Sequence, residues 1–228
     1  MKVSILGVEI DNVTMEQVLE YCNNLTIGVH YIFTPNPEII MEARDEKFKN
    51  ILNSADLLLP DGIGIVIASK ILGTPIAARV AGFDFVCNLL KTEKSFYLLG
   101  GKPGVAERAA AELEKQGVNI AGTCDGYFTD DSLVISDINA KKPDVLLVCL
   151  GAPKQERWIY KNRDKLSDML CIGAGGVLDV FAGDVRRAPD IYIKLNIEWL
   201  YRAVKQPQRF LRLWKLPWFL VKVVWEKI

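Results

Sequence analysis

Short apolar runs alternate with helical patterns along most of the chain, and this alternation limits the folds that it can adopt. The strand-like runs lie near residues 3–6, 29–33, 56–59, 95–99, 118–121, 144–150 and 169–172. The helical patterns lie near residues 14–23, 37–53, 62–72, 81–91, 103–116, 130–140 and 153–163. Repeated alternation of this kind predicts an α/β fold, in which a mostly parallel sheet is covered by helices.

The run from Val145 to Leu150 is apolar on both faces, as expected for a central strand of a parallel sheet. The segment that follows Gly104 carries alanine and leucine at helical spacing and closes at Gly117, which predicts a helix packed on that sheet. A chain of 228 residues buries roughly 70–75% of its unfolded surface, so its core needs neither a disulfide nor a metal.

Glycine and polar residues cluster directly after five of the predicted strands. The clusters are residues 34–36, 60–62, 100–104, 151–156 and 173–176. In an open parallel sheet the carboxyl ends of the strands face one crevice, where ligands bind. We therefore expect these five loops to converge on a single site.

Asp61 has two interpretations that local sequence does not separate. It precedes a predicted helix that starts near Gly62, so its carboxylate could cap that helix. It could equally point into the crevice and act as a general base toward a substrate hydroxyl.

Other loop residues are candidates for substrate binding, each with a structural alternative. Gly100 and Gly101 open a loop that could cradle a phosphate at a helix N-terminus, or could form a plain tight turn. Gln155 could hydrogen-bond a sugar or uracil, although it or Glu156 could instead cap a helix. Guanidinium groups pair well with diphosphate, but a solvated ion pair is the usual role of a surface arginine. The arginine candidates in the body are Arg79, Arg186 and Arg187.

No metal or cofactor is expected. The chain has no Asp-x-Asp pattern, no CxxC pair and a single histidine, His30, in a strand-like run. A metal-bound diphosphate is therefore unsupported, as is a zinc site. The five cysteines are widely spaced, which is typical of reduced thiols in a cytosolic protein.

The C-terminal segment differs from the rest in charge and in aromatic content. Residues 194–228 contain eight Lys or Arg against two Glu, a net charge of +6, while the formal charge of the whole chain is zero. Four of the five tryptophans also lie there. We divide the chain into a catalytic domain, 1–193, and a helical appendage, 194–228, with short helices near 190–205, 207–215 and 217–227. The composition favours docking on an anionic membrane surface, whereas the alternative is a helix packed on the body or on a second subunit.

The N-terminal apolar run is too short for a signal peptide, and no stretch approaches the ~20 apolar residues of a spanning helix. We therefore expect a cytoplasmic protein that is peripheral on the inner face of the cell membrane. We expect no nucleic-acid partner, and a homo-oligomer remains open.

Seven motifs together resemble the TagA/WecG/CpsF family of bacterial glycosyltransferases over nearly the whole chain. In chain order they are Thr34-Pro35-Asn36, Pro60-Asp61-Gly62, Arg79-Val80-Ala81-Gly82-Phe83-Asp84, Gly126-Tyr127-Phe128, Gly151-Ala152-Pro153-Lys154-Gln155-Glu156, Arg187-Ala188-Pro189 and Glu198-Trp199-Leu200-Tyr201-Arg202.

The resemblance implies an inverting, metal-independent transferase with a Rossmann-like core and a C-terminal appendage. Members of this family move N-acetylmannosamine, or a related sugar, from a UDP-sugar onto undecaprenyl-diphosphate-N-acetylglucosamine, in teichoic-acid or surface-polysaccharide synthesis. Carried over by motif, the base falls on Asp61. The substrate residues fall on Thr34, Asn36, Arg79, Gln155, Arg202, Arg209 and Arg212, and the glycines Gly100, Gly101 and Gly151 lie in the predicted ligand loops.

Three alternatives remain at this point. A transferase of the same family could use a different UDP-hexose. A nucleotide-binding oxidoreductase is disfavoured because no GxGxxG follows the first strand. A non-catalytic membrane-docking module would leave the five converging loops unexplained.

Overall fold

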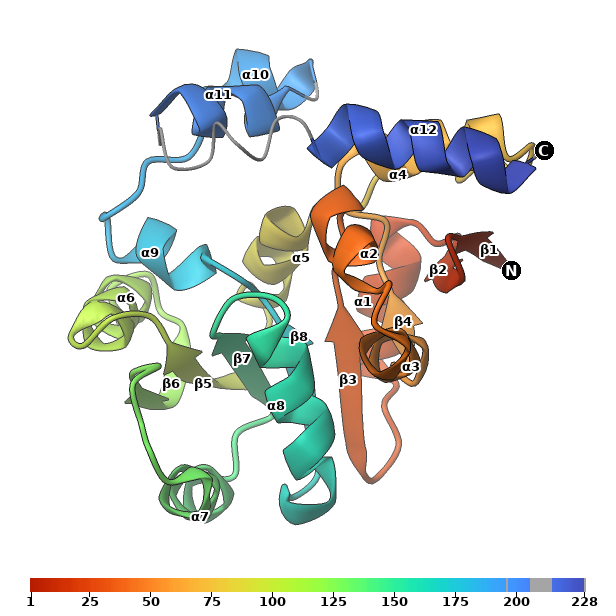
Figure 1. The fold of residues 1–228 in the computed structure, drawn as a ribbon. Helices are drawn as coiled ribbons and strands as arrows, with labels where there is room; N and C mark the ends of the chain where they lie inside the picture. The colour runs from red at the N-terminus through yellow and green to blue at the C-terminus, as the bar shows by residue number, and fades with distance from the viewer. Residues whose placement is uncertain (196, 206–214, 228) are drawn as a thin grey trace.

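The computed structural model describes residues 1–195, 197–205 and 215–227, and for residues 194 and 202–205 it describes the backbone alone. Its centre is a six-stranded sheet in the order β4-β3-β8-β7-β5-β6, and every strand pair in it is parallel (Figure 1). The strands are β3 (Val29–Phe33), β4 (Leu57–Leu58), β5 (Ser95–Gly100), β6 (Asn119–Cys124), β7 (Val145–Cys149) and β8 (Met169–Gly173). The predicted α/β fold is confirmed, and β7 lies inside the sheet as its two-faced apolar pattern indicated.

Successive side chains of the strands feed two separate cores, one on each face of the sheet. In β5, Phe96 and Leu98 belong to one core, whereas Tyr97 and Leu99 belong to the other. The Phe96 side is covered by α1 (Met15–Asn23), α5 (Gly82–Leu89), α6 (Val105–Glu114) and α9 (Val177–Phe181). The Tyr97 side is covered by α2 (Pro37–Glu42), α3 (Glu46–Asn53), α4 (Ile63–Ile71), α7 (Asp131–Lys141) and α8 (Lys154–Asn162), which the 3-10 turn η1 (Arg163–Lys165) follows.

The N-terminus differs from the single predicted strand at 3–6. It forms a hairpin of two antiparallel strands, β1 (Lys2–Ile5) and β2 (Val8–Asp11), which is separate from the main sheet. Leu6 and Gly7 turn the chain with φ of 52° and 79°, the positive values that a two-residue hairpin turn requires. The buried Asp11 carboxylate accepts a hydrogen bond of 2.9 Å from the Leu58 backbone N–H, which ties the hairpin to β4.

The predicted helix at 37–53 is interrupted, because Asp45 starts a new helix. The Asp45 side chain accepts a hydrogen bond from the Lys47 backbone N–H and caps α3, so α2 and α3 are distinct helices. The C-terminal segment forms α10 (Asp190–Lys194), α11 (Glu198–Lys205) and α12 (Lys215–Lys227). The helix predicted at 207–215 falls almost wholly outside the described residues.

Helix α12 packs against α2 and α4 by one of its faces (Figure 1). Phe219 and Val223, four residues apart and therefore on the same side of the helix, are completely buried in the core that contains Ile40 and Ile65. At its two ends, Lys215 pairs with Glu42 at 3.1 Å, and Glu226 accepts from the Leu6 backbone N–H at 2.9 Å. On this face of α12, the structure agrees with the alternative prediction, in which the C-terminal helix packs on the body of the protein.

Because Phe219 is part of this core, we expect Phe219→Ala to lower the free energy of unfolding by about 3 kcal/mol or more, the usual cost of a cavity left by a buried aromatic ring. The matched control is Val221→Ala on the outer side of the same helix, where the side chain is 40% exposed. It should change the free energy by less than about 1 kcal/mol. Urea denaturation of both variants measures the difference; equal losses would mean that α12 does not pack on the body as the structure shows.

Candidate active site

The five predicted loops meet around one cavity of about 1220 Å³ at the carboxyl edge of the sheet. Thr34 and Asp61 line it after β3 and β4, Gly101 after β5, Gln155 after β7 and Gly175 after β8. The convergence that the loop pattern predicts is therefore present. The sheet provides it because all six strands run in the same direction and end at one edge.

The C-terminal helices add a further wall to this cavity. Glu198 and Trp199 come from the start of α11, and Lys215 and Leu216 from the start of α12. Leu216 lies so close to α4 that a β-carbon on Gly64 would approach its Cδ1 atom to 2.7 Å. Core and appendage thus share one site.

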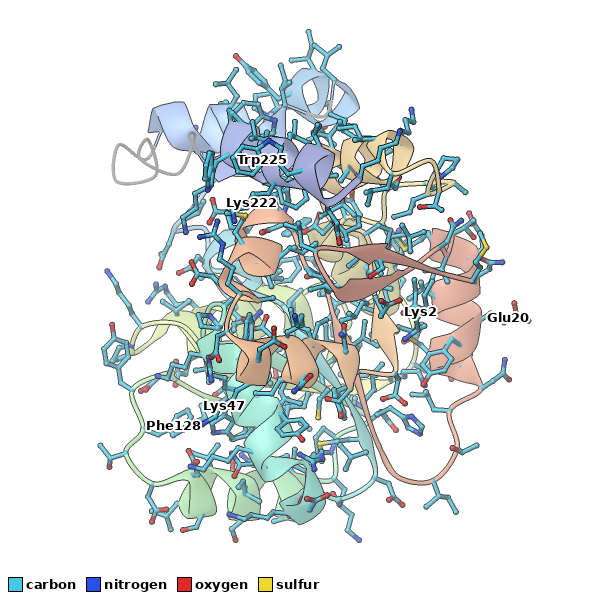
Figure 2. All side chains as sticks on the ribbon, turned by 45° about the vertical axis from the view of Figure 1, so that its right-hand side comes forward. Lys2, Glu20, Lys47, Phe128, Lys222 and Trp225 are labelled. Atoms are coloured by element: carbon cyan, nitrogen blue, oxygen red, sulfur yellow. The ribbon has the colours of Figure 1, made fainter. Side chains whose placement is uncertain are left out.

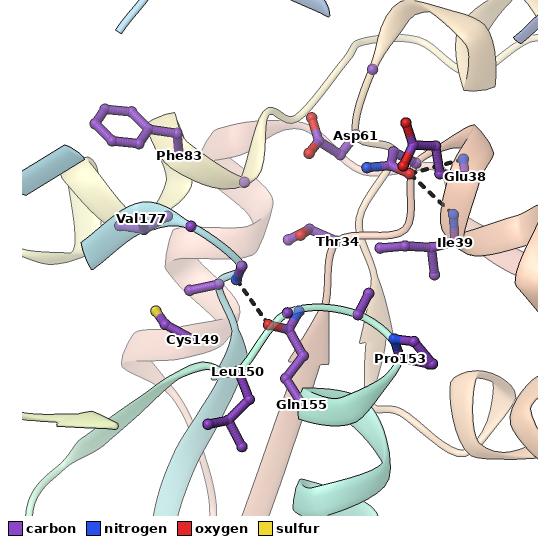
Figure 3. A pocket seen from close by; sticks show the side chains of 18 of the residues that line it. Thr34, Glu38, Ile39, Asp61, Phe83, Cys149, Leu150, Pro153, Gln155 and Val177 are labelled. Carbon is purple, nitrogen blue, oxygen red and sulfur yellow. Dashed lines mark hydrogen bonds between the residues drawn. The ribbon is translucent and has the colours of Figure 1, made fainter. Parts of the chain in front are cut away.

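Asp61 lines the cavity and is not the cap of the helix that follows it. The N-cap of α4 is Gly62, with φ of 87°, and no side-chain cap hydrogen bond forms at that position. Figure 3 shows Asp61, Thr34 and Gln155 around the same space. The structure therefore removes the capping interpretation of Asp61, while its role as a base stays a prediction.

Thr34 and Asn36 occupy the loop after β3. The Thr34 hydroxyl donates to the Gly173 carbonyl at 3.5 Å, which links the ends of β3 and β8. A β-carbon on Gly82 would lie 2.9 Å from Thr34 Oγ1, so the start of α5 rests directly on Thr34. Asn36 lines the cavity too, but its Oδ1 caps α2 by accepting from Glu38 and Ile39 at 2.9 and 3.1 Å.

Gln155 is held on three sides at the edge of the cavity. Its Oε1 accepts from the Gly175 N–H at 3.0 Å, and its Nε2 donates to Glu156 Oε1 at 2.9 Å (Figure 3 draws the first bond). The Gln155 side chain also packs closely against Gly173, where a β-carbon would lie only 3.1 Å from Gln155 Nε2. Neither Gln155 nor Glu156 caps α8, whose N-cap is Pro153.

The three predicted loop glycines have different roles. Gly101 and Gly151 line the cavity with φ of 76° and 75°, a conformation that favours glycine. Gly100 is not part of the lining. A β-carbon on it would lie 2.3 Å from the Cys149 carbonyl oxygen, so only glycine permits the close approach of these two strand ends.

The arginine candidates are placed differently from one another. Arg79 lines the cavity. Arg187 instead pairs with Asp84, and its guanidinium lies 4.5 Å from the centre of the Phe83 ring, which makes it a structural support of α5. Arg186 is exposed and outside the lining. The side chain of Arg202 and the whole of Arg209 and Arg212 lie outside the described residues.

Some lining residues were not singled out from the sequence. Lys154 donates to the Gly126 carbonyl at 3.3 Å and lies 6.0 Å from the Phe128 ring centre, in the same glycine-turn loop that contains Gln155. That shared loop was a usable signal. Trp199 belongs to the family motif at residues 198–202, but the sequence did not place it in the cavity, because its position depends on how the C-terminal segment folds onto the body. Other ionisable groups of the lining are Glu38, Glu42, Lys102 and Asp179.

The site has no reactive thiol and no cluster of metal ligands in the described ranges. Burial raises the pKa of the Cys149 thiol to about 12, so it stays protonated at neutral pH. Among the residues that the structure describes, no three His, Cys, Asp or Glu side chains are grouped so that they could hold a metal ion.

A comparison with protein families decides between the remaining functional classes. The chain matches the glycosyl transferase WecG/TagA/CpsF family over residues 3–228. It belongs to this family of glycosyltransferases. The resemblance drawn from the motifs is confirmed, and the oxidoreductase alternative is not supported.

Three curated relatives of this WecG/TagA/CpsF member share the name N-acetylglucosaminyldiphosphoundecaprenol N-acetyl-beta-D-mannosaminyltransferase. One from Bacillus spizizenii is 38% identical, with 85% of this chain and 78% of the relative covered. One from Bacillus subtilis is 37% identical over 86% of this chain and 79% of the relative. One from Staphylococcus aureus strain MW2 is 37% identical over 99% of this chain and 93% of the relative.

Proposed function

We propose that this protein transfers N-acetylmannosamine from a UDP-sugar to an undecaprenyl-diphosphate-linked N-acetylglucosamine, with inversion and without a metal. The family match over nearly the whole chain, to relatives of that name, carries the proposal. The cavity supports it, because Asp61, which is not the N-cap of α4, lines it together with polar and cationic side chains.

In the proposed reaction Asp61 removes the proton from the acceptor hydroxyl. The hydroxyl oxygen forms a bond to the anomeric carbon of the donor as the bond from that carbon to the diphosphate oxygen breaks. The electron pair of that bond leaves with UDP, and attack from the opposite side inverts the anomeric centre. Arg79, which lines the cavity, is placed to offset the charge that develops on the leaving diphosphate.

The acceptor is a lipid, so the proposal includes a membrane surface. The outer side of α12 exposes Trp218, Val221, Val224 and Trp225 by between 40% and 66%. Lys222 lies on the same helix, 5.8 Å from the centre of the Trp218 ring (Figure 2 labels Lys222 and Trp225). Aromatic rings edged by lysine suit the interface of an anionic leaflet. We assign residues 1–193 to catalysis and 194–228 to docking on the inner face of the cell membrane, with Arg202, Arg209 and Arg212 contacting the acceptor diphosphate.

The described helices include none that is both long and apolar enough to traverse a bilayer.

Ligand-induced thermal stabilisation tests the nucleotide part of the proposal. We expect UDP and UDP-sugars to raise the melting temperature and NAD to leave it unchanged, because only a ligand that binds the folded state stabilises it. Stabilisation by NAD and not by UDP would contradict the proposal.

We expect transfer to survive chelation. With 5 mM EDTA in the assay, the initial rate should stay within about twofold of the untreated rate, because the described residues contain no cluster of ligands for a divalent cation. The readout is UDP release with lipid acceptor. Loss of the rate on chelation, restored by magnesium or manganese, would show that the reaction needs a metal.

A further inference from the structure

Glu156 is a buried acid that the mechanism above does not use. It is 1% exposed and lies in the first turn of α8. Its Oε1 accepts from Gln155 Nε2, whereas its Oε2 has no hydrogen-bond partner among the described residues. An incompletely satisfied buried carboxyl costs stability, so a purely structural position would favour an apolar side chain.

The capping-box role of a glutamate at this position is excluded. Glu156 is the third residue of α8, where a glutamate commonly accepts from the backbone N–H of the N-cap residue. The N-cap here is Pro153, which has no N–H to donate. Its one hydrogen bond to another side chain goes to Gln155.

That hydrogen bond determines which way the Gln155 amide faces. The Glu156 carboxyl oxygen is an acceptor, so the amide nitrogen of Gln155 must face it. The Gly175 N–H is a donor, so the amide oxygen of Gln155 must face that side. With a neutral apolar neighbour in place of Glu156, only the Gly175 contact would restrain the amide. Burial raises the pKa of Glu156 to about 7, and its Oε1 can accept from Gln155 in either protonation state.

We propose that Glu156 is a positioning residue, which fixes the orientation of the Gln155 amide at the edge of the substrate cavity and acts on the reaction only through Gln155. This inference rests on the proposed transferase function.

A double-mutant cycle in kcat and KM tests it. The variants are Glu156→Met, which keeps the length of the side chain without an acceptor, Gln155→Ala, and the two combined. We expect Glu156→Met to lower kcat/KM tenfold or more in the wild-type background, and less than twofold in the Gln155→Ala background. Glu156→Gln, which keeps an acceptor oxygen, should stay within about threefold of wild type. If Glu156→Met does not fold, Glu156→Ala replaces it in the same cycle.

Thermal stability separates positioning from support of the fold. Glu156→Met should melt at least as high as wild type at pH 8, since it removes an incompletely paired buried carboxylate. A loss of activity that is equal in both backgrounds, or that follows a lowered melting temperature, overturns the inference, as does wild-type activity of Glu156→Met. The proposed function fails separately, if the wild-type protein itself shows no transfer.

Discussion

Asp61→Asn should abolish transfer while the protein stays folded and still binds UDP. Removing a general base typically costs ~10²–10⁴ in rate. Asparagine has nearly the same shape as aspartate and cannot take the proton. Because Gly62, not Asp61, is the N-cap of α4, the substitution removes no helix cap and should leave the melting temperature within about 2 °C of wild type.

The control is Glu42→Gln, a second carboxylate at the same cavity, whose side chain pairs with Lys215 and is 51% exposed. A surface ion pair contributes little, so this variant should keep its rate within about threefold. The measurements are single-turnover rates with a lipid acceptor and calorimetric affinity for UDP. Turnover of Asp61→Asn near that of wild type would exclude Asp61 as the base.

The second large effect concerns the outer side of α12. We expect Trp218→Gln combined with Trp225→Gln to lower the affinity for anionic vesicles by roughly tenfold to a hundredfold. The two rings are 47% and 66% exposed and lie 6.2 Å apart, so both are available to an interface. Moving the exposed part of each tryptophan ring from water into the membrane interface contributes on the order of 1 kcal/mol to the free energy of binding. Each 1.4 kcal/mol of binding free energy changes the affinity about tenfold.

Point variants test membrane docking by α12 better than deletion of the appendage does. Deletion would also remove Phe219 and Val223, which belong to the core, so a loss of folding would be mistaken for a loss of docking. The matched control is Leu133→Gln on α7. The Leu133 side chain is 71% exposed, and the helix α7 lies at the opposite end of the molecule from α12 (Figure 1). Sedimentation with vesicles of 30% anionic lipid, at low and high salt, gives the affinity. Equal binding by the double variant and wild type would show that α12 is not the docking surface.

The architecture was predictable from the sequence because its signals are local. Val145–Leu150 is apolar on both faces, and glycine and polar residues follow five of the predicted strands, so both the parallel sheet and the edge where its loops meet could be inferred. The hairpin formed by β1 and β2 was missed in part because its turn, Leu6-Gly7, has a non-glycine residue with positive φ. Such a turn has no strong sequence signature.

The roles of individual site residues were less predictable, because they depend on contacts between distant segments. Asn36 and Asp61 have the same local context, each after a strand and before a helix. Only the structure shows that Asn36 caps its helix while Asp61 does not. Gly100 is required by the Cys149 carbonyl of a neighbouring strand, a contact with no trace in the sequence near Gly100. Glu156 differs from an ordinary helix-start acid only because Pro153 lacks an N–H and because Gln155 turns toward it.

The identity of the product tests the proposed transfer most directly. Purified protein is incubated with a lipid-diphosphate-linked N-acetylglucosamine and, in separate reactions, with UDP-N-acetylmannosamine, UDP-N-acetylglucosamine and UDP-glucose, and the lipid products are analysed by mass spectrometry and NMR. We expect a disaccharide lipid from UDP-N-acetylmannosamine, with an anomeric configuration opposite to that of the donor. Retention of the donor configuration, or no disaccharide from any UDP-sugar, would contradict it.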